Sequence, residues 1–406
     1  MVKMLNLHGL IVTTVLWLVG CAYPANQQMI EQRTAFTNAT ILTSSSAEPL
    51  HDGVLVMEGD RIAWVGPAAD ADLSRTRAVD LEGAMVIPGL VDAHAHLSGL
   101  GQALESVDLV GTPSYEEVIQ RLQQLATSLP EGEWITGRGW DQNDWPEQSF
   151  PTIAELDRAI PDHPVAVTRI DGHALLANSR ALERARIDAS TPDPPGGSIL
   201  RSSDGKPTGV FVDNAMGLIN RVIPAGTRAD HKRQLERAAH TAAAAGLTEV
   251  HDAGVSQETI DILLELAGEG RLPIRVYAML EDDPQLLARW YQRGPLIAAE
   301  NDRVTVRAIK LYADGALGSR GAALHEPYAD APDQIGLLVT PPEHLRTVAK
   351  EAKRHGFQVG AHAIGDRGTT IVIDAFESAG AQPEDRFRIE HLQIVRLADL
   401  ERVAQM

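Results

Sequence analysis

Residues 86–99 read VIPGLVDAHAHLSG, and they place two histidines, His94 and His96, at the end of an apolar run. The residues before them favour a β-strand, in which side chains two positions apart leave the same face. Both imidazoles are then expected to approach one point at the end of the strand. Because imidazole is the commonest metal ligand in proteins, the spacing indicates either a pair of metal ligands or two ordinary polar residues at a strand end.

The overall composition narrows the kinds of partner. The chain has 406 residues, of which 44% are hydrophobic and 22% charged, so it can bury a large core in more than one structural unit. Its formal net charge of −19 disfavours nucleic acid and anionic membrane surfaces, because basic side chains are needed to offset phosphate repulsion. A small-molecule partner fits better, although acidity of this size also has the simpler reading of solubility.

The first residues differ from all that follow. One lysine and the amino terminus precede an apolar run at 10–19, and small residues come next, as at signal peptidase sites. The run is shorter than the roughly 20 residues of a transmembrane helix. LVGC at 18–21 resembles a bacterial lipobox, and Cys21 is the only cysteine. We expect 1–21 to be an export signal and a lipid on Cys21 to anchor an exported, periplasmic protein to the membrane; plain cleavage near Ala22 is the alternative.

Residues 30–87 predict a small sheet domain. Short β-like runs alternate there with turn signals, and Gly59 and Asp60 stand at a two-residue hairpin turn. Helical periodicity appears only after this domain. Ser114, followed three residues later by a glutamate, is typical of a capping box and predicts a helix over residues 114–129.

Residues 88–406 predict an α/β unit with a long insertion. The stretch from about 98 to 235 is rich in Trp, Pro and Gly and has no simple repeat, so it reads as an insertion. From residue 236 onward amphipathic helices alternate with five apolar strands, at 247–254, 272–280, 304–315, 357–365 and 386–394. Such alternation is typical of parallel βαβ units. With the strand before His94, six strands are visible, two fewer than a closed eight-stranded barrel has.

The candidate catalytic side chains stand at the ends of these strands, where a β/α barrel carries its working residues. After His94 and His96 on the first strand, three more follow: Lys310, His362 and His391. Each of them alone is explained as well by a hydrogen-bonded core or rim residue. Four imidazoles at the ends of three strands on one rim favour a divalent metal ion such as zinc.

Four motifs in this order resemble the amidohydrolase superfamily: GLVDAHAH, KLYADGALGSR, GAHAIGD and RIEHLQ. The sequence is most similar to the amidohydrolase-3 branch, which includes N-substituted formamide deformylases, from about residue 34 to the last residue. GRGWDQNDW and RIDGHALLANSRAL, within residues 137–182, also resemble segments of that branch. The resemblance implies an α/β fold, a metal-dependent hydrolase-type (β/α)8 TIM barrel with six of its eight strands present, and a small N-terminal β-sandwich domain.

The resemblance also implies roles for the residues at the strand ends. Two pairs of histidines match the family's ligands for one or two divalent ions: His94 with His96, and His362 with His391. Zinc is the ion that we expect there. Lys310 matches the lysine that many members carbamylate, a reaction with CO₂ that turns a lysine of lowered pKa into a carboxylate able to bridge two ions. A salt-bridged Lys310, paired with Asp314, is one alternative, and a mononuclear site is another.

Six further residues are candidates for contacting a small-molecule substrate. They are Trp140, Asp141, Arg169, His173, His251 and Arg320. The first two either line the mouth of the pocket or pack in the core. Arg169 and His173 resemble substrate-side positions of the branch, although a capped helix start explains His173 almost as well. His251 ends the second barrel strand without a clear metal partner, and Arg320 either holds a polar substrate group or caps a loop.

Taken with the family, these residues predict hydrolysis of a C–N bond other than a peptide bond, because a zinc-bound water ionises near neutral pH and attacks an amide carbonyl. An ester or lactone hydrolase with the same site is an alternative. The family's eighth-strand aspartate, which handles the proton of the departing nitrogen, has no match before the sequence stops at Met406. We therefore expect an incomplete enzyme with little activity and exposed strand edges that favour homo-oligomers, or else a non-catalytic ligand-binding lipoprotein.

Overall fold

The computed structural model describes residues 33–45 and 48–406. The chain divides into two compact units, Met1–Pro88 and Gly89–Met406. The export signal and the lipid-carrying Cys21 that the sequence predicts lie outside the described residues. Within the described ranges, no helix is both long enough and apolar enough to span a bilayer.

The smaller unit holds a five-stranded sheet in the order β3-β2-β1-β4, with β5 also paired to β1. Its elements are β1 (Arg33–Ile41), β2 (Leu50–Glu58), β3 (Arg61–Pro67), the 3-10 helix η1 (Ala68–Asp70), β4 (Arg77–Asp80) and β5 (Met85–Val86). The predicted hairpin turn at Gly59 and Asp60 is confirmed, because Glu58 pairs with Arg61 across the antiparallel strands β2 and β3. Where the family resemblance implies a β-sandwich, the described residues of this unit form this one sheet.

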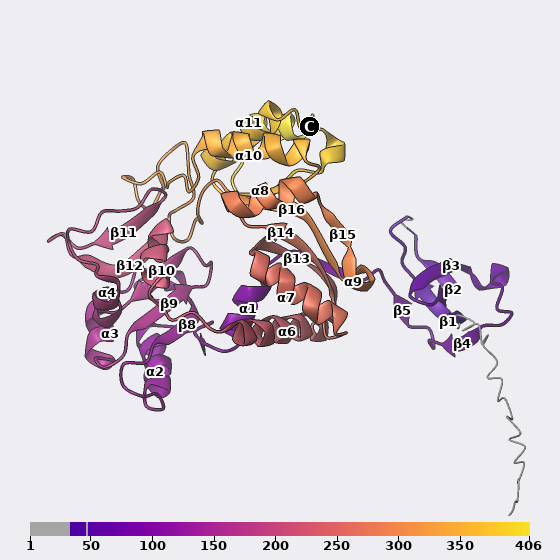
Figure 1. Ribbon diagram of the computed structural model, residues 1–406, viewed down its shortest axis with the longest axis horizontal. Coiled ribbons are helices and arrows are strands. Elements are labelled where there is room, and N and C mark those ends of the chain that lie inside the picture. Colours follow the sequence, from indigo (N-terminus) through magenta and orange to yellow (C-terminus); the bar gives the residue numbers. More distant parts are fainter. Residues whose placement is uncertain (1–32, 46–47) are drawn as a thin grey trace, which may run out of the picture. The chain divides into compact units, whose positions relative to one another are not determined.

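Six parallel strands form the main sheet of the larger unit, side by side in chain order (Figure 1). They are β6 (Leu90–Ala95), β13 (Leu247–Val255), β14 (Arg275–Leu280), β16 (Val304–Tyr312), β17 (Gln358–Ala363) and β18 (Arg388–His391). A short strand, β15 (Leu296–Ala298), adds antiparallel to β16. The predicted α/β fold with six barrel strands is confirmed. Because the strands are parallel, their carboxyl ends share one rim.

Helices follow these strands, as in repeated βαβ units. They are α6 (Arg228–Ala244), α7 (Gln257–Gly268), α8 (Pro284–Arg293), α9 (Ala299–Asp302), α10 (Pro342–Arg354), α11 (Asp366–Ser378), the 3-10 helix η4 (Pro383–Asp385) and α12 (Leu397–Val403). Helix α7 shows why they pack on the sheet. Its buried residues Ile260, Leu263 and Leu266 recur every three positions and form one apolar face. That face joins a core cluster with strand residues such as Val276 and Ile309.

The main sheet is curved, and its two edge strands approach each other at the rim. In the described part of the chain, β6 and β18 each pair with a neighbouring strand on one side only. Side chains of β18 nevertheless reach β6. The Arg388 guanidinium donates to the Ala93 carbonyl at 3.2 Å, and the ring centroids of His391 and His94 lie 4.6 Å apart. The sheet is therefore a near-barrel whose first and last strands meet through side chains.

Between β6 and β13 the chain forms a second sheet of six strands, in the order β11-β12-β10-β9-β8-β7 (Figure 1). The elements of this insertion are α1 (Leu97–Ala103), β7 (Val107–Asp108), α2 (Tyr115–Ala126), β8 (Ile135–Trp140), η2 (Gln142–Asp144), α3 (Ile153–Ala159), β9 (Val165–Arg169), β10 (Ala174–Ala177), α4 (Ser179–Ala185), β11 (Gly197–Arg201), β12 (Pro207–Asp213), η3 (Asn214–Met216) and α5 (Gly217–Asn220). Neighbouring residues of β10, Leu175 and Leu176, enter different hydrophobic clusters, so both faces of this sheet are covered.

The sequence predicts the presence of the insertion but not its sheet. The predicted helix does form, as α2, and it begins as expected: the hydroxyl of Ser114 accepts a hydrogen bond from the Glu117 N–H at 3.2 Å. That bond satisfies one of the free N–H groups of the first helical turn.

Candidate active site

The rim of the main sheet brings the four candidate histidines together. His94 lies near the end of β6, His96 directly before α1, His362 in β17 and His391 at the end of β18. The ring centroids are 4.6 Å apart for His94 and His391, 4.6 Å for His362 and His391, and 5.3 Å for His94 and His96. The four rings thus form one contiguous cluster at the carboxyl ends of three strands.

Hydrogen bonds orient the rings of His94, in β6, and His96, directly after it. The Nδ1 atom of His94 lies 2.8 Å from a carboxylate oxygen of Glu390, and the Nδ1 atom of His96 lies 2.9 Å from the Ala253 carbonyl oxygen. Since a carboxylate and a carbonyl only accept, both Nδ1 atoms donate, and each Nε2 keeps its lone pair. Imidazoles that bind metals are typically held in this way by a carboxylate or a backbone carbonyl.

The pKa values of three of the rings are lowered, which favours their neutral form. Burial lowers the pKa of His96 to about 4 and that of His391 to about 4, with neighbouring positive charges adding to the effect. His362, only 2% exposed, has its pKa lowered to about 2 by the same burial and by the charge of Lys310. Its Nε2 donates to the Gly315 carbonyl at 3.2 Å. Neutral imidazole is the form that binds metal ions.

Lys310 lies beneath this cluster, fully buried in β16. Its ammonium nitrogen has no hydrogen-bond partner among the described residues and stands 3.8 Å from the centroid of the Tyr312 ring. Burial lowers the pKa of Lys310 to about 7. The alternative of a salt bridge with Asp314 is wrong, because the Asp314 carboxylate instead accepts hydrogen bonds from the backbone N–H groups of Ala323, Ile364 and Gly365.

The residue types of this cluster fit a divalent metal ion. Four adjoining imidazoles, three of them held neutral, supply nitrogen ligands, and the unpartnered amine of Lys310 stands among them. As the side chains stand, however, no three His, Cys, Asp or Glu residues in the described part of the chain form a ready group of ligands. The imidazole ligands are present on one rim, and their rings contact each other edge to face. A bound ion would instead require their nitrogen atoms to point towards one place.

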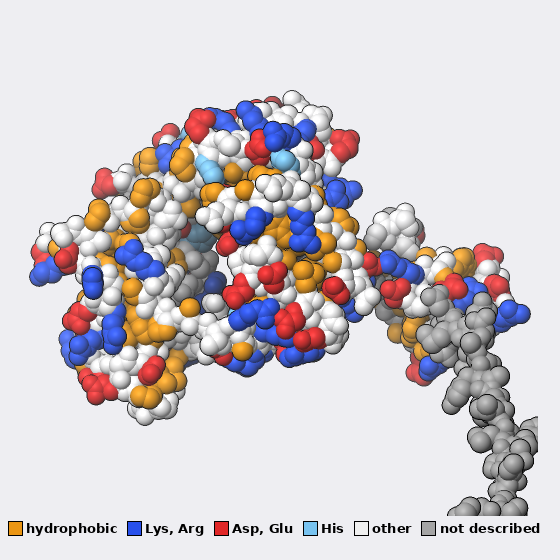
Figure 2. All heavy atoms as spheres, viewed as in Figure 1, with side chains coloured by type: hydrophobic (Ala, Val, Ile, Leu, Met, Phe, Trp, Pro, Cys, Tyr) orange, Lys and Arg blue, Asp and Glu red, His pale blue; other side chains and the backbone are white. Residues whose placement is uncertain are grey.

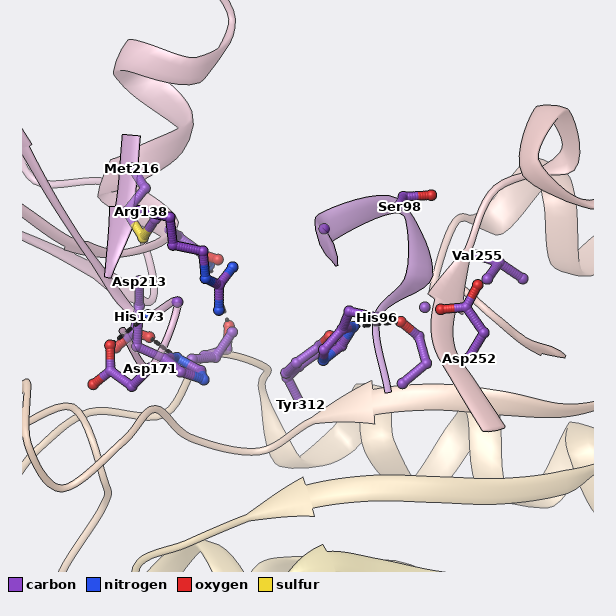
Figure 3. A pocket seen from close by; sticks show the side chains of 16 residues that line it. His96, Ser98, Arg138, Asp171, His173, Asp213, Met216, Asp252, Val255 and Tyr312 are labelled. Atoms are coloured by element: carbon purple, nitrogen blue, oxygen red, sulfur yellow. Dashed lines mark hydrogen bonds and ion pairs between the residues drawn. The ribbon is translucent and has the colours of Figure 1, made fainter. Parts of the chain in front are cut away.

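A cavity of about 480 Å³ lies between the rim and the insertion. Figure 2 shows the surface hollowed between these parts of the larger unit, and Figure 3 shows the side chains that face the space. The main sheet and α1 contribute His96, Ser98, Asp252, Val255 and Tyr312, and the insertion contributes Arg138, Asp171, His173, Asp213 and Met216. Because His96 lines the cavity, a molecule bound there reaches the histidine cluster.

His173 links the insertion to the cluster. Its Nδ1 lies 2.6 Å from a carboxylate oxygen of Asp213, and its ring centroid lies 4.9 Å from that of His362. The Asp213 side chain is almost fully buried, and burial raises its pKa. Asp213 also has a positive φ of 50°, a strained conformation for a non-glycine residue at the end of β12. Such strain is typical of functional positions.

Arg169 and Asp141 do not line the cavity. The Arg169 guanidinium is buried, forms ion pairs with Asp141 and, at 2.7 Å, with Asp171, and donates to Gln142 at 2.8 Å. Arg169 therefore acts as a support: it fixes Asp171, which does line the cavity.

Three further candidates also lie away from the described cavity. Trp140 is fully buried and donates to the Val167 carbonyl at 2.9 Å, so it is a core residue. The ring of His251 contacts Arg388 at 2.9 Å and packs against Tyr277. Arg320 pairs with Asp330 at 2.8 Å. Of the six candidates, the structure places only His173 in the cavity wall.

Sequence reasoning missed Glu390, Asp213 and Arg138. Glu390 immediately precedes His391, and its partner His94 is 296 positions away, so no local pattern indicates the contact. Asp213 likewise meets His173 only because β12 and β10 are neighbours. Arg138 lies inside GRGWDQNDW, where the resemblance drew attention to Trp140 and Asp141.

Residues 77–406 match the family model described as the amidohydrolase family. The chain belongs to this amidohydrolase family. A solved structure of an uncharacterised metal-dependent hydrolase from Pyrococcus horikoshii OT3 is 33% identical, with a TM-score of 0.70 over 92% of this chain and 73% of the other. This likeness agrees with the fold described above.

Two curated proteins extend the comparison. Protein LONG AFTER FAR-RED 3 of Arabidopsis thaliana is 33% identical over 91% of this chain and 66% of its own length. An N-substituted formamide deformylase of Arthrobacter pascens is 28% identical over 91% of this chain and 70% of its own length. The chain thus spans about two thirds of the length of these curated relatives.

Proposed function

We propose that this amidohydrolase cleaves a C–N bond other than a peptide bond in a small molecule, such as a non-peptide amide or a formamide, with the help of divalent metal ions. The observation that carries the proposal is the cluster of four histidines near a buried lysine without a hydrogen-bond partner among the described residues, next to a cavity of small-molecule size. Family membership and the likeness to an N-substituted formamide deformylase support the amide class.

The four rim histidines would hold one or two divalent ions, which we propose to be zinc: His94, His96, His362 and His391. An ion at this place supplies a nucleophilic water at neutral pH and polarises the substrate carbonyl. The chain's own contribution is orientation. Glu390 and the Ala253 carbonyl fix the rings of His94 and His96 with Nε2 free. His173, whose Nδ1 proton is donated to Asp213, keeps Nε2 for a polar atom of the substrate.

Lys310 would enter the site as a carbamate. A lysine whose pKa is near 7 is half neutral at that pH and mostly neutral above it, and its amine lone pair forms an N–C bond to CO₂ with loss of one proton. The product is an anion in a place where the ammonium form has no hydrogen-bond partner among the described residues. Carbon-13 NMR after incubation with labelled bicarbonate and metal is expected to show a carbamate signal that Lys310→Ala abolishes. A metal-loaded protein with no such signal contradicts this assignment.

A substrate panel tests the proposed reaction. Zinc-loaded protein is assayed on N-formyl and N-acyl amines, and on esters and lactones with matching acyl groups. In keeping with the little activity expected from the sequence, we expect slow turnover of amides, which falls at least 100-fold in a His94→Ala, His96→Ala double variant, since loss of the ligands removes the nucleophile. His240→Ala, at an exposed position of α6, is the control. Turnover confined to esters overturns the C–N assignment, and ligand binding without any turnover overturns hydrolysis.

We also propose that Cys21 carries a lipid and that the protein is held at a bacterial membrane on the exported side. The support is the LVGC motif after an apolar run, with Cys21 as the only cysteine of the sequence. Cells that express the whole chain are labelled with a palmitate analogue and fractionated. The wild-type protein is expected in the labelled membrane fraction, and Cys21→Ser is expected to be unlabelled. Equal labelling of the two contradicts the proposal.

A further inference from the structure

An irregularity at the end of β8 sends the side chains of Arg138 and Trp140 in different directions. The register between β8 and β9 pairs Arg138 with Thr168 but Trp140 with Arg169, so one residue, Gly139, is unpaired. Gly139 has a φ of 119°, and a Cβ there would lie 2.6 Å from the Val110 backbone nitrogen, so a glycine is required. Bulges of this kind redirect side chains near functional sites. Here Trp140 enters the core, and Arg138 lines the cavity.

The guanidinium of Arg138 runs through a gap lined by glycines. A Cβ on Gly172, in the insertion, would lie 3.2 Å from Nη2, and a Cβ on Gly99, in α1, would lie 4.0 Å from Nη1. Figure 3 shows the side chain extending from the insertion towards the space that separates it from His96. Because Gly172 and Gly99 have no side chains, the guanidinium fits between them and lines the cavity.

Arg138 has no carboxylate partner among the described residues. Its Nη2 donates to the Ile170 carbonyl at 3.1 Å, which uses one of its five N–H donors. The nearby Arg169 is different, because it forms ion pairs with two aspartates. Arg138 is also the only lysine or arginine among the described residues that line this cavity.

Each carboxylate of the same cavity has a polar partner on at least one oxygen, although one oxygen of Asp213 and one of Asp252 accept no hydrogen bond among the described residues. Asp171 pairs with Arg169 at 2.7 Å, and Asp213 accepts from His173 at 2.6 Å. Asp252 is 2% exposed and accepts the Leu97 N–H at 2.9 Å. A bound molecule therefore meets one unpaired positive charge on the insertion side of the cavity and the histidine cluster on the other.

Arg138 also borders a second cavity, beside α6, and the acids there have polar partners too. Arg233 pairs with Glu105 at 3.0 Å and with Asp230 at 2.7 Å. The third acid of this cavity, Glu258, lies 3.6 Å from His231, and among the described residues no carboxylate of either cavity forms an ion pair with Arg138. A guanidinium presents a planar fork that matches a carboxylate through two parallel hydrogen bonds.

We propose that Arg138 binds a carboxylate of the substrate, so that the preferred substrates are N-acyl or N-formyl amines that carry a carboxylate away from the scissile bond. The inference rests on the proposed function and narrows its substrate class. Arg138 is a binding residue in this account. It holds the far end of the molecule while the amide lies near the histidine cluster.

Binding is measured by calorimetry with N-benzoyl-6-aminohexanoate and with its neutral analogue N-benzoyl-6-aminohexanamide, in which a five-carbon chain separates the end group from the amide nitrogen. We expect the wild-type protein to bind the carboxylate roughly tenfold more tightly or better. Arg138→Gln is expected to lose this preference with little change in binding of the amide, and Arg138→Lys to keep part of it. Arg184→Gln, an exposed arginine of the same insertion that lines neither cavity, is the control and is expected to behave like the wild type.

Equal affinity for both ligands, no saturable binding of the carboxylate, or a preference that survives in Arg138→Gln overturns the inference. Kinetics separate it from the proposed function. If metal-loaded protein hydrolyses neutral amides and shows no carboxylate preference, the proposed reaction is supported and the role of Arg138 is contradicted. If Arg138 controls binding but no amide is hydrolysed, the role of Arg138 is supported and the proposed reaction is contradicted. Where both hold, Arg138→Gln raises KM for the carboxylate substrates and leaves kcat and metal content nearly unchanged.

Discussion

At the level of single residues, the orientation of His94 depends on Glu390. The carboxylate is mostly buried, lies 2.8 Å from Nδ1 of His94 and also contacts the Nε atom of Arg388 at 2.7 Å. A carboxylate behind a ligating imidazole fixes its tautomer and raises its basicity. Glu390 is therefore a positioning residue that acts on a metal ion through His94.

We predict that Glu390→Gln weakens zinc binding about 10-fold or more, because the amide cannot supply the negative charge behind His94. Competition with a chromophoric chelator measures the affinity. Glu384→Gln, a neighbouring change on the 3-10 helix η4, is expected to have no effect. An unchanged zinc affinity in Glu390→Gln would show that the His94 contact has no bearing on metal binding.

Replacing Lys310 by methionine is predicted to raise the stability of the protein and to abolish its activity. A buried amine without a hydrogen-bond partner, which contacts only the face of the Tyr312 ring, destabilises the metal-free protein. Lys310→Met keeps the hydrocarbon and removes the amine, so we expect the free energy of unfolding to rise by about 1 kcal/mol while hydrolysis is lost. Lys310→Ala leaves a cavity and is expected to lower the free energy of unfolding by about 2 kcal/mol. Urea denaturation of metal-free protein checks both, and a destabilised Lys310→Met would mean that the amine has a stabilising partner.

Residue-level reasoning from sequence found the histidines and Lys310 because strand ends are visible as breaks in apolar runs. Placement at the carboxyl end of a parallel strand follows from local pattern alone. Glu390, Asp213 and Arg138 depend on contacts between distant strands or on a bulge, and neither is encoded in a short motif. Trp140 was ambiguous from sequence because a tryptophan suits a core and a pocket mouth equally well.

At the level of elements, the loop after β16 is tied to the end of β17 by one side chain. The Asp314 carboxylate is fully buried and accepts three backbone N–H groups, from Ala323 at 2.8 Å, Ile364 at 3.0 Å and Gly365 at 2.8 Å. These bonds satisfy donors that would otherwise be buried without a partner. They also hold Gly315, whose carbonyl contacts His362, beside the rim.

We predict that Asp314→Ala lowers the free energy of unfolding by about 3 kcal/mol, since three buried N–H donors lose their acceptor. Hydrogen exchange is expected to accelerate at Ala323, Ile364 and Gly365 in particular. Asp330→Ala, which removes the exposed partner of Arg320, is the matched control and is expected to change stability by no more than about 0.5 kcal/mol. Unchanged protection of these three amides would contradict the role of Asp314.

The strands of the main sheet were predictable, and those of the insertion were not. A mostly buried parallel strand reads as a largely apolar run near amphipathic helices, as at β17 between α10 and α11. The strands of the insertion are short, reach only two residues at β7, and alternate with Gly- and Pro-rich loops. Their pairing is set by packing on both faces of the sheet, which no single segment reveals.

At the scale of the larger unit, the edge strand β18 lies beside an apolar cavity of about 320 Å³. Its walls include Phe376, Phe387, Ile389, Leu392, Val403 and Met406. In the described residues the outer edge of β18 has no strand paired to it. Unpaired edges next to apolar surface favour association between chains.

We predict concentration-dependent self-association in sedimentation velocity experiments. Leu392→Lys places a charge at this edge and is expected to shift the protein towards the monomer. Leu397→Lys, at a position that is 81% exposed and outside the cavity wall, serves as the control and is expected to leave association unchanged. A monomeric wild-type protein at all concentrations would contradict this prediction.

The central claim is that the rim histidines hold divalent metal for hydrolysis, and elemental analysis tests it most directly. Purified wild-type protein, equilibrated with zinc and freed of excess ion, is compared with the His94→Ala, His96→Ala double variant and with His240→Ala. The account predicts at least one equivalent of zinc in the wild type and in His240→Ala, and loss of that zinc in the double variant. Full retention of zinc in a folded double variant would contradict the account.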